Sequence, residues 1–290
     1  MPAALTMPRV HGARWDLRLR KLVLECGAHP CRRFTVTHRL LRRDGISFDD
    51  AWYCSAECLQ DALGRRLRVA ARGCVEPLRR PGRLPFRLIL VDRGVLREAQ
   101  LREALRLQAE QGGSLEEILL AHGLATEIQI ASAKAAEHGC PVMTCLPSVR
   151  PCFDLPRGLI ERYKARVVYS SDACLLIGFV TRVAPVLLQA VEAIAGRRAA
   201  CCFIAADALH SRGAQAGAGD ALLEAEMAPL VSADAARFLV QRAMDTGAER
   251  VRMATGNQWA WIRLSRGERL EDSIDVSLPL SPDESRIARA

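Results

Sequence analysis

Four cysteines in two close pairs are the residues whose type and spacing most clearly indicate chemistry. Cys26 and Cys31 form the first pair, and after 22 intervening residues Cys54 and Cys58 form the second. Four thiolates supplied as two pairs are a common ligand set for a tetrahedral zinc ion. Because protein would fill all four coordination positions, the predicted zinc ion is structural. His29 lies inside the first pair as a possible substitute ligand, and the competing interpretation is four buried thiols without a metal.

The second cysteine pair lies at the expected start of a helix. Ser55 is a suitable N-cap residue, and residues 59–69 have the pattern of a helix. Backbone N–H groups at a helix start stabilise thiolate charge. Residues 45–53 fit a short hairpin that precedes this helix. The segment resembles treble-clef zinc fingers of the TRASH and FCS kind, whose second knuckle reads aromatic-Cys-Ser-x-x-Cys, although the first pair here is separated by four residues instead of two.

The distribution of apolar residues indicates the cellular compartment, and the compartment decides how the remaining cysteines are interpreted. The N-terminal residues lack the apolar core of a signal peptide, and no run of about 18 apolar residues occurs. We therefore expect a cytoplasmic protein without a membrane span. Since that compartment is reducing, the 11 cysteines are not interpreted as a disulfide framework. The seven outside the two pairs show no second ligand pattern.

The net charge of +8 is unevenly distributed along the 290 residues. Residues 1–100 hold 20 basic and 10 acidic side chains, a net charge of +10, and the rest of the chain has a net charge of −2. A basic region of this kind indicates either a contact with nucleic acid or another anionic partner, or a solvated arginine-rich surface. Aromatic residues do not alternate with the basic ones, as they do in stacking platforms.

A repeat with an offset of 29 residues follows, in which Gly94 of the first copy corresponds to Gly123 of the second. Each copy predicts a short helix, a glycine at positive φ, an apolar pair and a longer helix. Two capping boxes predict helix starts at residues 115 and 127. They consist of Ser114 with Glu117, and Thr126 with Gln129.

The repeat resembles the N-terminal MshEN domain of type II secretion and type IV pilus assembly ATPases, whose tandem copies bind cyclic di-GMP. The resemblance implies a ligand-binding role for the matched positions, with one arginine displaced by two residues. These are Arg87, Leu90, Gly94, Leu101, Leu105, Gln108, Leu115, Leu119 and Gly123. The second copy departs from the motif at Ser114, Glu116, Lys134 and Glu137, where the family has arginine, glycine, an apolar residue and glutamine.

The resemblance continues through residues 151–211, where a helix introduced by a proline precedes strands and a further helix in the order α-β-β-α-β. Residues 222–275 resemble the start of the N2 region of the same ATPases. The sequence contains no G-x-x-x-x-G-K-[ST] motif, so the phosphate cradle of the ATPase motor is missing.

Together these features predict an α+β multidomain chain. It would hold a small treble-clef zinc module, a four-helix repeat unit with a small α/β subdomain, and a short C-terminal α/β unit. The expected boundaries are 1–72 for the basic zinc module, 73–84 for a linker, 85–211 for the MshEN-like domain (helical half 85–150, α/β half 151–211), 222–275 for the C-terminal unit and 276–290 for a tail.

No catalytic constellation is visible, because none of the six histidines lies in a nucleophile motif. We therefore expect a non-catalytic cytoplasmic adaptor or regulatory protein that contacts secretion or pilus machinery or a regulatory complex. Structural zinc is the expected cofactor, and degenerate binding of cyclic di-GMP is left open. The alternative is a zinc-finger regulator that binds nucleic acid through residues 1–72.

Overall fold

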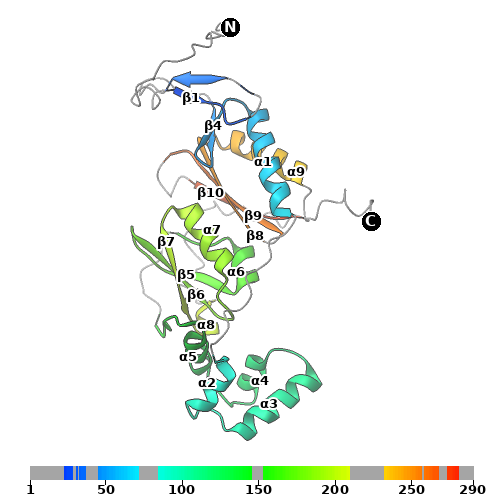
Figure 1. Ribbon diagram of the computed structural model, residues 1–290, viewed down its shortest axis with the longest axis vertical. Helices are drawn as coiled ribbons and strands as arrows, with labels where there is room; N and C mark the ends of the chain where they lie inside the picture. Colours follow the sequence, from blue (N-terminus) through cyan, green and yellow to red (C-terminus); the bar gives the residue numbers. More distant parts are fainter. Residues whose placement is uncertain are drawn as a thin grey trace, which may run out of the picture.

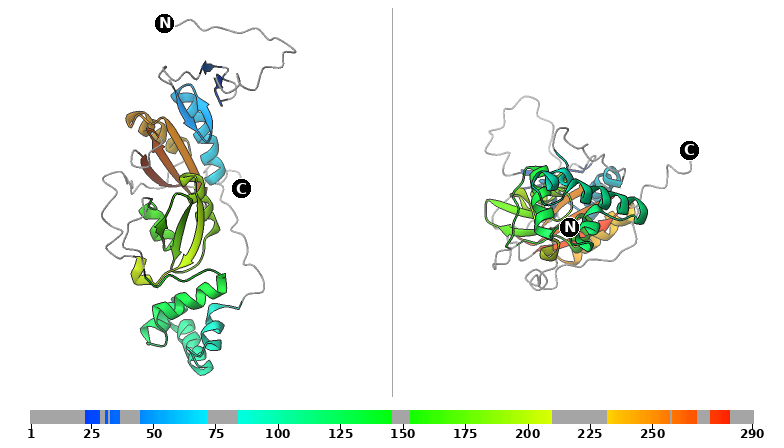
Figure 2. Two further views of the ribbon diagram at one scale, coloured as in Figure 1. Left: turned by 90° about the vertical axis from the view of Figure 1, so that its left-hand side faces the viewer. Right: turned by 90° about the horizontal axis from the view of Figure 1, so that it is seen from below.

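The computed structural model has an α+β fold made of several units. It describes residues 23–28, 31, 33–36, 45–71, 84–145, 153–209, 232–256, 258–267 and 273–280. A helical unit, a three-stranded sheet and a five-stranded sheet follow one another along the long axis of the molecule (Figures 1 and 2). None of the helices in the described ranges is long and apolar enough to cross a membrane.

The helical unit follows the predicted repeat. Its helices are α2 (Phe86–Asp92), α3 (Glu98–Gln111), α4 (Leu115–Ala121) and α5 (Glu127–His138). Both predicted capping boxes are formed, with Ser114 Oγ accepting from the Glu117 N–H at 3.2 Å and Thr126 Oγ1 accepting from the Gln129 N–H at 3.3 Å. Each box satisfies backbone donors that a helix start leaves without partners.

The α/β half follows the predicted order α-β-β-α-β. It consists of α6 (Arg157–Tyr163), β5 (Ala165–Ser170), β6 (Cys174–Phe179), α7 (Pro185–Ala195) and β7 (Arg198–Phe203), followed by the short α8 (Ala206–Leu209). Strand β6 pairs antiparallel with β5 and parallel with β7. Helix α7 makes the crossover that a parallel pair requires.

The two ends of the chain build one sheet together. Its strand order is β10-β9-β8-β3-β4, from β3 (Ile46–Phe48), β4 (Ala51–Tyr53), β8 (Arg250–Gly256), β9 (Trp259–Ser265) and β10 (Ser273–Pro279). Strand β3 lies parallel to β8, and the Ser47 N–H donates to the Glu249 carbonyl at 2.9 Å. The segments 1–72 and 222–275, which the sequence analysis treats as separate units, are therefore joined.

Each face of this sheet packs on different elements. On one face lie α1 (Ala56–Ala71) and α9 (Ser232–Asp245), and their core includes Leu63, Leu239 and Ile262. On the other face Trp259 and Trp261 join the core of the α/β half. The Trp259 indole N–H donates to the Tyr163 hydroxyl at 2.8 Å. The five-stranded sheet is thus the layer that connects α1 and α9 to the α/β half.

The predicted tail is corrected at its start. Strand β10 extends to Pro279 and pairs with β9 along its whole length. Val276, Leu278 and Leu280 are buried because alternate residues of this strand face the core. The tail is predicted to begin at residue 276, but the strand continues to Pro279, which ends an edge strand, where a missing N–H is tolerated. Residues 281–290 lie outside the described part of the chain, as does the predicted linker 73–84 apart from Leu84.

Candidate metal centre

The first cysteine pair lies on a loop that is attached to the five-stranded sheet. This loop follows β1 (Val23–Glu25), which pairs with β2 (Phe34–Val36). Cys26 forms a β-bridge with Trp52 of β4, and the Gly27 N–H donates to the Trp52 carbonyl at 2.8 Å. A Cβ atom on Gly27 would lie 2.9 Å from the Ala51 Cβ, so only glycine allows this close approach.

The second pair lies where β4 passes into α1. Cys54 follows the last residue of β4, and Cys58 lies in the first turn of the helix. The Cys58 N–H donates to Ser55 Oγ at 3.3 Å, which is the predicted N-cap interaction. The sulfur of Cys58 is therefore held by a helix start whose backbone dipoles favour negative charge.

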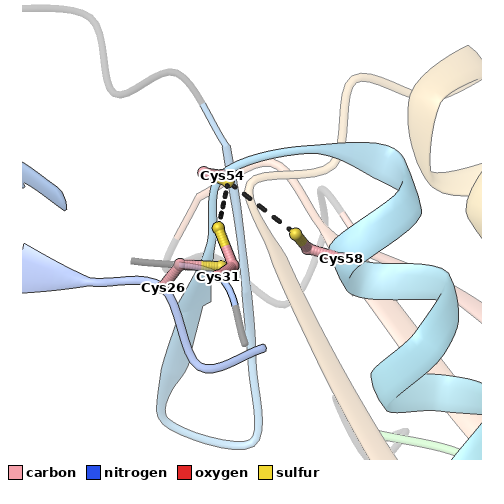
Figure 3. Close-up of side chains that lie close together, drawn as sticks. All are labelled: Cys26, Cys31, Cys54 and Cys58. Carbon is pink, nitrogen blue, oxygen red and sulfur yellow. Dashed lines mark hydrogen bonds between the residues drawn. The ribbon is translucent and has the colours of Figure 1, made fainter. Parts of the chain in front are cut away.

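The structure brings all four predicted cysteines together (Figure 3). Their sulfur atoms lie within 4.8 Å of one another. The Sγ atom of Cys54 is 3.6 Å from that of Cys31 and 3.8 Å from that of Cys58, too far for a disulfide bond. Tetrahedral zinc with Zn–S bonds of about 2.3 Å holds its ligands about 3.8 Å apart. The group therefore has the size and donor set of a site that could hold a metal ion.

Electrostatics at the group depend on the charge of the sulfurs. The backbone N–H of Arg33 donates to the sulfur of Cys31 and lowers the pKa of that thiol. Burial, together with hydrogen bonds with the neighbouring thiols, raises the pKa of Cys54 to about 12. Four thiolates at such distances repel one another, and a divalent cation is the group that removes this cost.

The group lies at the edge of the core formed by the two chain ends. Cys26 is buried, and Cys31, Cys54 and Cys58 are half-buried and pack against the same core. Its chemistry fits a structural ion, since four sulfurs leave no coordination position for water or substrate. His29 lies outside the described residues, so its role as a substitute ligand stays a prediction.

The positions that the repeat motif marks for ligand binding differ in their exposure. The leucines at positions 90, 101, 115 and 119 are buried in the core of the helical unit. Arg87 and Leu105 are exposed, and the Gln108 side chain donates to the Gly113 carbonyl at 3.2 Å. Gly94 and Gly123 have φ values of +69° and +61° and occupy the predicted turns. The four leucines thus belong to the helical core and the two glycines to turns, and a ligand-binding role of these positions stays a prediction.

Sequence reasoning did not find that three charged side chains are buried, namely Lys134, Arg166 and Arg263. Arg263 of β9 forms a bidentate pair with Asp275 of β10, at 2.8 and 2.5 Å, and lies over the Phe153 ring. Lys134 of α5 is only 4% exposed and pairs with Glu116. The apolar run Trp259–Leu264, interrupted only by Arg263, could have indicated the arginine, and the apolar neighbours of Lys134 on its helix could have indicated the lysine.

Comparisons with known proteins give partial likenesses to solved structures. No protein-family model and no curated protein matches the sequence. A structure of MshE with cdg is 26% identical, with a TM-score of 0.33, over 44% of this chain and 94% of that chain. The N-terminal domain of XpsE is 18% identical, with a TM-score of 0.34, over 43% of this chain and 88% of that one.

Proposed function

We propose that this chain is a non-catalytic adaptor or regulatory protein of the cytoplasm, stabilised by a structural zinc ion and acting through protein–protein contacts. The observation that carries the proposal is the four-sulfur group, in which every coordination position of a tetrahedral ion is taken by the protein. Such an ion stabilises a fold and performs no reaction on a substrate. The motif resemblance of residues 85–211 makes a component of a secretion or pilus machinery the proposed partner.

The helical unit offers the surface for this partner. Leu88 and Ile128 are large apolar side chains that are 43% and 49% exposed, although their helices α2 and α5 pack against each other. Exposed apolar side chains of this size are a common component of protein contacts. Met244 of α9 is exposed to a similar degree on a different unit, and it provides a matched control.

Affinity capture from an extract of the source cells tests the adaptor role. The immobilised protein and its Met244→Ser variant should retain the same secretion or pilus component, and the double variant Leu88→Ser, Ile128→Ser should lose it. Retention of no such component by the unaltered protein would contradict the proposal. Salt-sensitive retention of DNA by the unaltered protein would instead favour the nucleic-acid regulator.

Cyclic di-GMP binding is a separate part of the resemblance, and we expect it to be lost. A ligand with two phosphates requires arginine forks and a close backbone approach, whereas the second repeat offers Ser114 and the carboxylate of Glu116. Calorimetry with the full chain at about 100 μM ligand should give no binding heat. A saturable signal with one ligand site per chain would show that the departures are tolerated.

A further inference from the structure

Lys134 is a buried cation that the four-sulfur group and the proposed partner surface leave unexplained. Its ammonium lies 2.9 Å from Glu116 Oε1 of α4 and donates to the Val180 carbonyl, at the end of β6, at 3.1 Å. It also lies 5.6 Å from the centre of the Phe86 ring at the start of α2. One side chain of α5 thus contacts two other helices of the helical unit and the sheet of the α/β half.

Such a cation is tolerated only with its full set of partners. Moving an ammonium group out of water costs several kcal/mol, and removing one member of a buried pair leaves the other charge without compensation. The geometry at Lys134 supplies a carboxylate, a carbonyl and a ring face. The contact that crosses between units is the bond to Val180, because Glu116 and Phe86 both belong to the helical unit.

Other hydrogen bonds also connect α5 and the residues just after it to neighbouring elements. Glu127 Oε2, at the start of α5, accepts from the Asp207 N–H of α8 at 3.0 Å. Glu137 Oε2, at its other end, accepts from the Phe86 N–H at 3.1 Å. Just after α5, the Met143 N–H donates to the Phe203 carbonyl of β7 at 2.8 Å. Helix α5 is therefore the element that joins the helical unit to the three-stranded sheet (Figure 1).

We propose that Lys134 is an internal clasp that fixes the helical unit on the α/β half without any bound ligand. Glu116 and Lys134 both depart from the repeat motif, and they form an ion pair with each other. The two departures therefore belong together: a glycine and an apolar residue of the motif are replaced by two opposite charges. The chain supplies both charges of the contact itself. The relative position of the two parts is then set by the protein alone, and this inference does not depend on the adaptor role.

Hydrogen exchange of the full chain tests the clasp through Lys134→Met. This variant keeps an unbranched apolar stem of nearly the same length and removes the ammonium. We expect the Met143 and Asp207 amides, whose bonds join α5 and its flank to β7 and α8, to exchange at least about tenfold faster. Amides of β8 and β9 should keep their protection. Unchanged exchange at Met143 and Asp207 would overturn the proposal.

Two further variants keep the test decisive. Arg106→Met removes an exposed ion pair of the same unit, with Glu103 and Glu110, and should leave both reporter amides unchanged. If Lys134→Met does not fold, Glu116→Gln replaces it, since it keeps the shape of the partner and removes its charge. A smaller acceleration confined to the same two amides supports the clasp, and a uniform acceleration or none overturns it.

Discussion

At the scale of single residues, the turn between β3 and β4 holds an unusual pair. Asp49 and Asp50 have φ values of 45° and 66°, in the left-handed region that asparagine and glycine tolerate better. Asp49 also lies against β8, and its N–H donates to the Val251 carbonyl at 3.4 Å. The turn before β4, the strand that leads to Cys54, is therefore strained at two successive residues.

Asp49→Asn should stabilise the protein, and more so at neutral than at acid pH. Burial raises the pKa of Asp49, although Arg66 opposes this shift. The folded state then binds the proton more tightly than the unfolded state, so stability falls as pH rises through the raised pKa. Removing the charge should gain on the order of 0.5 kcal/mol at pH 7 after allowance for solvent screening, and less of this gain should remain below the ordinary pKa of aspartate.

Urea unfolding at pH 7 and at about pH 3, below the ordinary pKa of aspartate, measures this difference. Asp50→Asn is the matched control, because Asp50 shares with Asp49 the turn, a positive φ and an exposed position. Any benefit that asparagine brings to the backbone appears in both variants. A gain for Asp49→Asn that is equal at the two pH values would assign the effect to the backbone and contradict the role of burial.

At the scale of elements, α1 and α9 are held close by small residues. A Cβ atom on Gly64 of α1 would lie 3.8 Å from the Cβ of Ala236 of α9, which is an ordinary contact distance. Gly64→Ala should therefore be accommodated and add about 0.5–1 kcal/mol through helix propensity. Gly64→Leu should force the helices apart and cost about 1–3 kcal/mol. Thermal unfolding of the two variants gives both values, and equal stabilities would contradict the close packing.

The elements also show what the sequence could predict. The capping boxes at Ser114 and Thr126 and the turns at Gly94 and Gly123 are local signals, and the structure forms them where they were expected. The four cysteines were also predicted, because metal ligands leave a spacing pattern. Strand β10 was missed because its polar residues and Pro279 hid the alternation of apolar residues.

The missed features share a dependence on distant partners. Nothing near Ser47 indicates that β3 pairs with β8, since about 200 residues separate the two strands. Lys134 has its partners on α4 and at the end of β6. In the sequence it is only a charged residue among apolar residues of α5, and nothing nearby indicates a partner. The pairing of Arg263 with Asp275 depends on the same unpredicted strand β10. Pairing between remote segments is decided by packing, which a single sequence does not display.

At the scale of the whole molecule, a metal ion in the four-sulfur group should stabilise not only the N-terminal region but also the C-terminal strands and helix that pack on it. The core next to the four sulfurs includes residues of α9, β8 and β10, such as Leu239, Val251 and Leu278. Metal analysis should return one zinc ion per chain. Chelation, or Cys54→Ser, should raise hydrogen exchange in β8 and α9 as well as in β3 and β4, while α2–α5 keep their protection, because binding energy of a structural ion is folding energy.

Cys174→Ser serves as the control, since Cys174 lies on β6 outside the group, and this variant should keep its zinc. Faster exchange confined to residues 23–58 after chelation would show that the metal stabilises only its own loops. A protein that contains no metal and keeps its full protection would remove the structural role altogether.

The shared sheet also sets the order in which the protein can be completed during synthesis. Strands β3 and β4 leave the ribosome early, but their neighbour β8 follows about 200 residues later. The helical unit and the three-stranded sheet, whose contacts are closer in sequence, can fold during the interval. The edge of β3 remains without its partner for that time, and an open strand edge is prone to pair with other chains. If a metal ion binds early, it would hold the hairpin to the loop of Cys26 and Cys31. Fewer incorrect strand pairings would then be open to the nascent chain.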